Sequence, residues 1–280
     1  MEYITLYNGV KMPILGYGVY QVNPAECARC VRDAIEIGYR SIDTAQAYAN
    51  EEGVGEAVHD CGVPREELFI TTKVWISNAG YEKASLSIEE SLKKLKMEYL
   101  DLLLIHQPFG DYYGTYRAME EAYQAGRVRA IGVSNFYPDR FIDLWKFSRI
   151  KPAVNQIETH VFQQQKAAHE ILNKYGTQVE SWGPFAEGKN NLFINETLKS
   201  IGELHGKSPA QTALRFLIQS GVVVIPKSTH KERMLENYMV FDFSLTDEEM
   251  EQIRALDKAE SAFFSHQDPQ IVEWFLSRVE

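Results

Sequence analysis

Short β-rich runs of apolar residues alternate with longer amphipathic segments along almost the whole chain. The stretch from Tyr3 to Leu15 alternates around Asn8-Gly9, a pair typical of a tight hairpin turn. Beyond it, β-rich runs occupy residues 15–19, 40–43, 68–72, 100–105, 128–133, 153–157, 178–181 and 222–225. The pattern therefore predicts an N-terminal hairpin followed by eight short strands.

The segments between these runs have helical periodicity. In Pro24–Ile37, for example, Val31 and Ala34 share an apolar face, and charged residues lie on the other face. Residues 84–97, 116–125, 140–147 and 163–175 are similar, and residues 191–221 have room for two helices. Ser208-Pro209 is a typical helix start, and Thr246 to Glu249 forms a capping box that opens a further helix.

Strands that alternate with helices imply a parallel sheet. Eight such units within 280 residues indicate an α/β protein with a (β/α)8 TIM barrel, whose bottom we expect the N-terminal β-hairpin to plug. A doubly wound open sheet is the competing architecture. No Pro-, Gly- or Ser-rich linker divides the chain, so residues 1–280 are predicted to form a single domain.

Composition narrows the range of partners. The chain has 39 acidic and 29 basic residues, a net charge of -10, which disfavours nucleic acid or an anionic membrane as the main partner. No segment approaches the ~20 apolar residues of a membrane span. Three cysteines, an odd and small number, favour a reducing cytoplasm. Cys27 and Cys30 fall inside a predicted helix, so we expect no metal site, and we expect a monomer.

Polar and ionisable residues follow the apolar runs where the strands end. In a parallel barrel the C-terminal strand ends meet at one rim, and active sites of this architecture lie there. The residues at or just after these ends are Asp43 with Tyr48 behind it, Lys73, His106, Ser134-Asn135, Asn155 to Glu158, Trp182 and Pro226 to Ser228. The sequence therefore predicts a polar site at this rim.

Four of these residues form a coherent proton-transfer set. A tyrosine has an ordinary pKa near ~10, and a neighbouring ammonium such as Lys73 lowers it. Pairing with Asp43 would keep Lys73 charged, so that Tyr48 could donate a proton to a carbonyl oxygen. Each residue alone also has a structural interpretation: Asp43 as a turn cap, Lys73 as a solvated lysine, Tyr48 as a surface aromatic and His106 as a buried, hydrogen-bonded histidine.

Three stretches of the sequence resemble the aldo-keto reductase family. They are Gly38 to Ala45 with Glu51, Val54 and Gly55; Met119 with Arg129 to Phe136; and Ile225 to Ser228 with Arg233, Glu236-Asn237 and Val240. The likeness is closest to small bacterial members, such as the 2,5-diketo-gluconate reductase group. It implies a catalytic tetrad of Asp43, Tyr48, Lys73 and His106, in which Tyr48 is the acid and His106 orients the carbonyl.

The resemblance also implies a cofactor site. Ser134, Asn135 and Gln156 would hold the nicotinamide carboxamide of NADPH or NADP+, and Trp182 would stack on the ring. Lys227, Ser228 and Arg233 place two cations and a hydroxyl near a helix start, which suits an anion. In the family they bind the 2′-phosphate, while Glu236 and Asn237 contact the adenine. We therefore predict a preference for NADPH over NADH.

The sequence departs from the family at the substrate pocket. Relatives often have Trp after the catalytic histidine, whereas this chain has Gln107, which we expect to widen or polarise the pocket. The residues proposed to contact substrate are Tyr20, Trp75, His106, Gln107 and Phe109. The tail carries Phe263-Phe264 and Trp274-Phe275, which either pack on the barrel or cover the pocket.

The expected function is NADPH-dependent reduction of an aldehyde or ketone to an alcohol, the substrate being a small carbonyl, an α-dicarbonyl or a keto-sugar. Two alternatives stay open at this point. One is a Schiff-base lyase that uses Lys73 as nucleophile, which requires a neutral lysine in an apolar site. The other is a binding protein that senses NADPH with little turnover.

Overall fold

Eight parallel strands form the centre of the computed structural model, which describes residues 1–277 and 279. The strands, in their order around the sheet, are β10 (Val223–Val224), β9 (Gln178–Trp182), β8 (Val154–Glu158), β7 (Val128–Ser134), β6 (Leu100–Ile105), β5 (Phe69–Val74), β4 (Ser41–Asp43) and β3 (Tyr17–Gly18). Leu15 pairs in parallel with Val224, and the amide of Gly16 donates to the carbonyl oxygen of Val224 at 2.8 Å. The sheet is therefore closed, which confirms the barrel and excludes the open doubly wound sheet.

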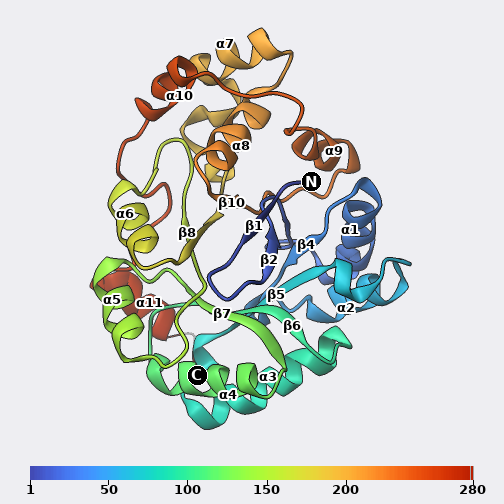
Figure 1. Ribbon diagram of the computed structural model, residues 1–280, viewed down its shortest axis with the longest axis vertical. Coiled ribbons are helices and arrows are strands. Elements are labelled where there is room, and N and C mark those ends of the chain that lie inside the picture. Colours follow the sequence, from blue (N-terminus) through green and yellow to red (C-terminus); the bar gives the residue numbers. More distant parts are fainter. Residues whose placement is uncertain (278, 280) are drawn as a thin grey trace.

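The N-terminal hairpin covers the end of the barrel at which the strands begin. Its strands are β1 (Tyr3–Thr5) and β2 (Lys11–Pro13), which pair antiparallel. The side chain of Asn8 donates to the carbonyl oxygen of Arg129, and the hydroxyl of Tyr7 donates to that of Lys151. Because these acceptors lie near the starts of β7 and β8, the hairpin sits over the bottom of the barrel, as predicted (Figure 1).

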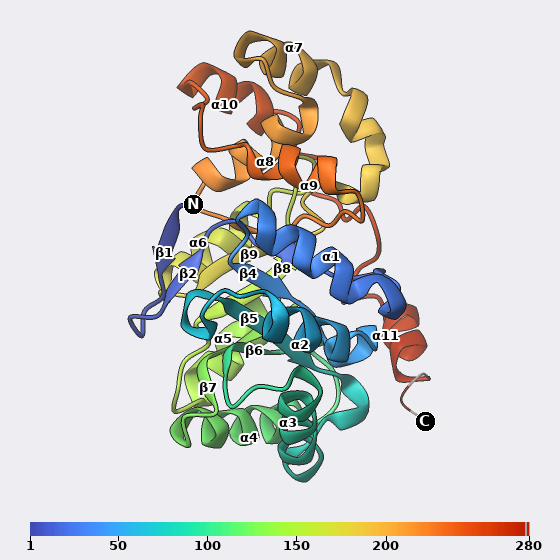
Figure 2. The same ribbon diagram turned by 90° about the vertical axis from the view of Figure 1, so that its right-hand side faces the viewer.

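Helices surround the strands. They are α1 (Pro24–Ile37), α2 (Glu51–Asp60), α3 (Tyr81–Leu95), α4 (Tyr112–Gln124), α5 (Pro138–Phe147), α6 (Lys166–Lys174), α7 (Glu196–His205), α8 (Pro209–Gln219), α9 (Lys231–Tyr238), α10 (Asp247–Arg254) and α11 (Pro269–Leu276). Ser208 and Thr246 are the N-caps of α8 and α10, as predicted. The capping box of α10 was predicted as well, whereas that of α8, formed with Gln211, was not. Figure 2 shows α11 on the side of the molecule opposite the hairpin, so the C-terminal segment lies at the end where the strands finish.

The sequence did not predict the helices α2 and α11. The sequence of α2 contains Gly53 and Gly55, which lower helical propensity and interrupt the apolar pattern. Packing accounts for Gly55, because a Cβ atom there would lie 2.5 Å from the carbonyl oxygen of Leu95 at the end of α3. A Cβ atom at Gly53 would lie 2.9 Å from the Cβ atom of Cys27 in α1. The close packing of α2 against α1 and α3 therefore outweighs the low intrinsic propensity of these glycines.

Buried apolar side chains of the strands and of the surrounding helices form one large hydrophobic cluster. Cys27 and Cys30 are buried in α1, and all three cysteines are free thiols. In residues 1–277 and 279, no group of three or more His, Cys, Asp or Glu side chains could hold a metal ion. Within the same residues, no helix is long and apolar enough to cross a membrane.

Candidate active site

A buried ion pair between neighbouring strands lies at the centre of the site. Asp43 is the last residue of β4, and Lys73 lies one residue before the end of β5. The Nζ atom of Lys73 is 2.5 Å from Oδ1 of Asp43 and donates to the carbonyl oxygen of Thr44 at 2.8 Å. Both side chains are almost completely buried. Burial acts to lower the pKa of Lys73, but the interactions with Asp43 and, after it, Tyr48 outweigh burial and raise the pKa, so Lys73 remains an ammonium ion.

Tyr48 lies beside this pair at the end of a short 3₁₀ turn that follows β4 (Gln46–Tyr48). The Nζ atom of Lys73 is 5.1 Å from the centroid of the Tyr48 ring. Burial raises the pKa of Tyr48 to about 12, although Lys73 acts in the opposite direction. The expectation of a net lowering was therefore wrong, because the loss of hydration has the larger effect. The phenol is fully protonated at neutral pH and can act as a proton donor.

His106 follows β6 directly and faces Tyr48. The ring centroids of His106 and Tyr48 are 5.5 Å apart, and that of Trp75 is 5.0 Å from His106. Burial first, and then the charge of Lys73 and the proximity of His266, hold the pKa of His106 well below its ordinary value. The imidazole is therefore neutral. Its buried Nδ1 atom has no hydrogen-bond partner among the described residues.

The four residues expected at the nicotinamide lie in one network next to the tetrad. The side-chain nitrogen of Asn135 donates to the carbonyl oxygen of His106 at 3.1 Å, and its oxygen accepts from the indole of Trp182 at 2.8 Å. The hydroxyl of Ser134 donates to the backbone oxygen of Gln156 at 2.8 Å. Gln156 in turn donates to Asp43 at 2.9 Å. The structure therefore connects these residues directly with the buried ion pair.

The residues expected at the 2′-phosphate gather around the start of α9. Lys227 and Arg233 are exposed, and neither forms an ion pair within residues 1–277 and 279. Ser228 is buried, and its hydroxyl accepts a hydrogen bond from the backbone amide of His230. Two unpaired cations beside a helix N-terminus fit a phosphate group well.

The two residues expected at the adenine lie further along α9. Asn237 is buried, and Glu236 is partly buried. The carboxylate of Glu236 accepts a hydrogen bond from the hydroxyl of Ser208, the N-cap of α8. Glu236 therefore joins α9 to α8, and this contact fixes the position of its side chain. The sequence did not indicate the contact.

The residues expected to contact substrate surround the mouth of the barrel. Tyr20 is half exposed, and its ring centroid is 5.0 Å from that of Tyr48. Phe109 and Gln107 are buried. The Phe275 ring of α11 lies 6.2 Å from Trp75 and 5.6 Å from Phe109, measured between centroids. The tail therefore packs on the barrel and also forms part of the wall beside His106.

Gln107 is bound to the tail. Its side-chain oxygen lies 2.8 Å from Nε2 of His266 and accepts from the amide of Asn135 at 3.3 Å. The His266 ring stacks on Phe109 and Phe275 and is almost completely buried. The sequence did not indicate His266. No local pattern marks it, because its partners lie far away along the chain.

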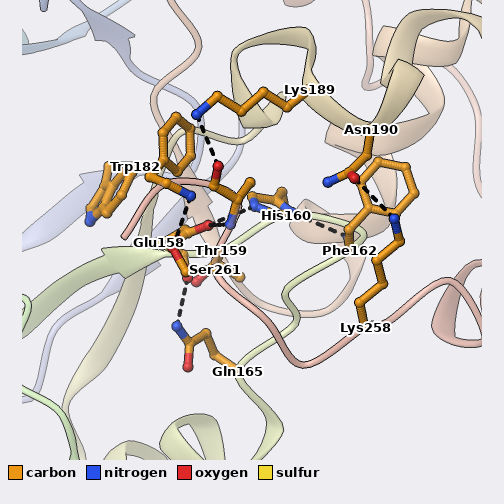
Figure 3. Close-up of polar contacts among 12 residues, drawn as sticks. Glu158, Thr159, His160, Phe162, Gln165, Trp182, Lys189, Asn190, Lys258 and Ser261 are labelled. Carbon is orange, nitrogen blue, oxygen red and sulfur yellow. Dashed lines mark hydrogen bonds and ion pairs between the residues drawn. The ribbon is translucent and has the colours of Figure 1, made fainter. Parts of the chain in front are cut away.

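A second set of contacts holds the tail just before His266 (Figure 3). The buried carboxylate of Glu158, at the end of β8, accepts from the Ser261 hydroxyl at 2.5 Å and from the Ala262 amide at 2.8 Å. His160 Nε2 lies 3.0 Å from the same carboxylate. Lys189, in the loop after β9, donates to the carbonyl oxygen of Ala262 at 2.9 Å. These contacts place Phe263 with its ring centroid 5.2 Å from that of Trp182.

Sequence reasoning also missed Glu180, a fully buried carboxyl group in the middle of β9. It lies 2.9 Å from the same Gln156 nitrogen that binds Asp43. A signal was present in the sequence. Glu180 is a charged residue inside a run expected to be buried on both faces, and it lies two positions before Trp182, hence on the same face of the strand.

Taken together, the closed barrel and the polar groups at its rim define an oxidoreductase of the (β/α)8 class. Residues 14–258 match the model of the Aldo/keto reductase family, and the chain belongs to this family, as its motifs predicted. It is 49% identical over 259 residues to glyoxal reductase of Bacillus subtilis, covering 92% of this chain and 93% of that protein. It is 41% identical over 258 residues to methylglyoxal reductase DkgA of Escherichia coli, covering 91% and 93%. A solved structure of a Gox0644 mutant in complex with NADPH superposes with a TM-score of 0.90 at 38% identity, covering 95% and 97%.

Proposed function

We propose that this protein reduces small aldehydes and ketones to alcohols with NADPH, and that α-dicarbonyls such as glyoxal and methylglyoxal are its preferred substrates. Two similar proteins are named for the reduction of these compounds. The aromatic wall of Trp75, Phe109 and Phe275 beside His106 favours a small substrate. The related structure with NADPH supports the cofactor.

The observation that carries the proposal is the buried ammonium of Lys73 next to a protonated Tyr48. NADPH, when bound, supplies hydride to the carbonyl carbon. Tyr48 donates its proton to the carbonyl oxygen, and Lys73 stabilises the negative charge that develops on the phenol oxygen. Asp43 keeps Lys73 charged. His106, as a neutral imidazole, donates a hydrogen bond that orients the carbonyl group.

The residues for the cofactor fall into two groups. Ser134, Asn135 and Gln156 would hold the nicotinamide carboxamide, with Trp182 against the ring. Lys227, Ser228 and Arg233 would hold the 2′-phosphate, with Glu236 and Asn237 at the adenine. Since Lys227 and Arg233 have no carboxylate partner within the described residues, their charges are available for a phosphate. NADH lacks this group, so NADPH is the expected cofactor.

The Schiff-base alternative is disfavoured by the state of Lys73. A nucleophilic lysine must be neutral, whereas the interactions with Asp43 and, after it, Tyr48 raise the pKa of Lys73 in spite of its burial. The sensing alternative is disfavoured by the arrangement of the tetrad. A protein with little turnover does not need these four side chains together, whereas proton transfer does, and here they lie close together.

The direct test is the oxidation of NADPH by the purified protein with glyoxal, methylglyoxal, simple aldehydes and keto-sugars, with NADH in parallel. We expect turnover that is selective for NADPH and fastest with the α-dicarbonyls. Tight binding of NADPH without turnover of any carbonyl would favour the sensing alternative. If keto-sugars are reduced faster than α-dicarbonyls, the proposed substrate class is wrong, but NADPH-dependent carbonyl reduction remains the reaction.

A further inference from the structure

The side-chain amide of Gln156 binds two carboxyl groups inside the barrel. Its nitrogen donates to Oδ2 of Asp43 at 2.9 Å and to Oε2 of Glu180 at 2.9 Å. All three side chains are almost completely buried. Both amide hydrogens are therefore used, and they fix which way the amide faces. Its oxygen has to point away from the two carboxyl groups.

The charges around Glu180 do not balance if it is ionised. The groups that act on it are Asp43 from β4, Lys73 from β5 and the uncharged Gln156 from β8, while its neighbour in β10 is the apolar Val223. One ammonium ion therefore faces two carboxyl groups. Lys73 contacts Asp43 directly at 2.5 Å, so Asp43 is the one that remains ionised.

A second observation supports a neutral Glu180. Its Oε1 atom is buried and has no hydrogen-bond partner within the described residues. An ionised oxygen in that position would lack both water and a donor, which is far less favourable than a neutral carboxyl group. Burial, and then the negative charge of Asp43, raise the pKa of Glu180 to about 8.

We propose that Glu180 is a positioning residue of the reductase site: as a neutral carboxylic acid it orients the Gln156 amide toward the nicotinamide and leaves Asp43 as the single counter-charge of Lys73. This inference rests on the proposed function. Ionisation of Glu180 adds a second negative charge next to Lys73. The phenol of Tyr48 then becomes a weaker acid, because its conjugate base is less stabilised, and proton transfer slows.

Two variants separate the effects. Glu180→Gln retains an acceptor for Gln156 and cannot ionise, so it mimics the neutral acid. Glu180→Leu removes both the hydrogen-bond acceptor for Gln156 and the ionisable carboxyl group. The control is Glu51→Gln, which alters another buried carboxyl group with a raised pKa, hydrogen-bonded to Thr72 outside this network.

The first measurement uses the protein without cofactor. Infrared difference spectra between about pH 6 and about pH 10 report the carbonyl stretch of a protonated carboxylic acid. We expect a band that disappears through about pH 8 and that is absent in Glu180→Gln but present in Glu51→Gln. If wild type and Glu180→Gln give the same spectra, Glu180 is not the protonated group and the proposal is overturned.

The second measurement is NADPH binding at neutral pH, followed by protein fluorescence. We expect Glu180→Leu to bind NADPH about tenfold more weakly, the effect of losing one hydrogen bond, because the Gln156 amide is no longer oriented. Glu180→Gln should bind NADPH like wild type.

The third measurement is kcat for the reduction as a function of pH. The wild-type value should fall about threefold to tenfold as pH rises through about 8, with little change in KM for the carbonyl, and Glu180→Gln should not show this step.

The outcomes distinguish the two proposals. If wild type binds NADPH but reduces no carbonyl, the proposed function fails, while the infrared and binding experiments still test Glu180. The role of Glu180 is refuted, and the proposed function stands, in either of two cases when turnover is normal. In the first, Glu180→Gln keeps the wild-type pH step in kcat. In the second, Glu180→Leu binds NADPH like wild type. If Glu180→Leu does not fold, Glu180→Gln alone decides through the infrared spectra and the pH profile.

Discussion

The tetrad and the C-terminal tail lie at the same end of the barrel, but they are built in different ways. The charged members of the tetrad, Asp43 and Lys73, belong to neighbouring strands whose register brings them into contact. The tail reaches the site through side chains far apart in the sequence, with 103 positions between Ser261 and Glu158 and 159 between His266 and Gln107. Neighbouring strands therefore position the charged groups directly, whereas the tail forms a wall that is held by side-chain contacts distant in the sequence.

This difference separates two kinds of mutational effect. Changes in the strand-borne group should alter the chemical step and the stability of the whole barrel. Changes in the tail should alter substrate binding, and they should change stability only through the contacts of the tail itself, because the tail takes no part in the parallel ladder. The predictions below test whether the two regions behave independently.

The largest expected effect follows from Tyr48→Phe, which removes the proposed acid and retains the ring. We expect kcat for carbonyl reduction to fall about 10³-fold, in the range typical of a lost general acid. NADPH binding, measured by fluorescence titration, should be unchanged. Turnover close to that of wild type would remove Tyr48 from the mechanism.

Asp43→Asn leaves the ammonium of Lys73 buried without its counter-charge. We expect a loss of about 3 kcal/mol in the free energy of unfolding, measured with urea, and a large loss of activity. The control is Asp33→Asn, which removes a surface partner of Arg29 and should change stability by less than about 1 kcal/mol. Equal losses in the free energy of unfolding for both variants would mean that the buried pair contributes no more to stability than a surface pair.

The sequence predicted the strand-borne half of this comparison well. The largely apolar run from Leu100 to Ile105 matches β6 at both ends, and the polar residues after the runs do meet at one rim. The helix α2 was missed because Gly53 is explained by packing against α1 and Gly55 by packing against α3, and no local pattern reveals either contact. Glu180 was missed although its position inside a buried run was visible in the sequence.

The tail could not be predicted from local patterns. The sequence shows the aromatic residues Phe263 and Phe275, but their partners Trp182 and Phe109 lie in other parts of the chain. The same holds for the pairing of His266 with Gln107. Contacts of this kind depend on the assembled barrel, so periodicity, capping signals and motif spacing carry no information about them.

The tail contact has a pH dependence of its own. Burial lowers the pKa of His266 to about 4, compared with about 6.5 in an unfolded chain. As pH falls from about 6.5 to about 4, the unfolded state takes up the proton first, and the free energy of unfolding decreases by up to about 3 kcal/mol. His266→Gln should therefore lose stability less steeply over this range, in urea unfolding, than wild type does. An identical slope in both proteins would contradict the assignment, and His59→Gln on the exposed side of α2 is the control.

The smallest expected effect concerns cofactor choice. Arg233→Ala should weaken NADPH binding about tenfold, as for one charge-assisted contact to a phosphate, and should leave NADH binding unchanged. Lys231→Ala is the matched control on the same helix, because its ammonium already pairs with Glu36 at 2.5 Å. Equal losses for NADPH and NADH in Arg233→Ala would refute the phosphate contact.

The central claim is that the tetrad directs hydride from NADPH to a carbonyl carbon with Tyr48 as acid. The most direct measurement uses NADPH carrying deuterium on the transferable position of its nicotinamide, with methylglyoxal as substrate and mass spectrometry of both product and protein. We expect an alcohol with one deuterium on the carbon that bears the new hydroxyl, about 10³-fold slower formation of it by Tyr48→Phe, and an unmodified Lys73. A deuterium-free product, or a covalent adduct on Lys73 trapped with borohydride, would contradict it.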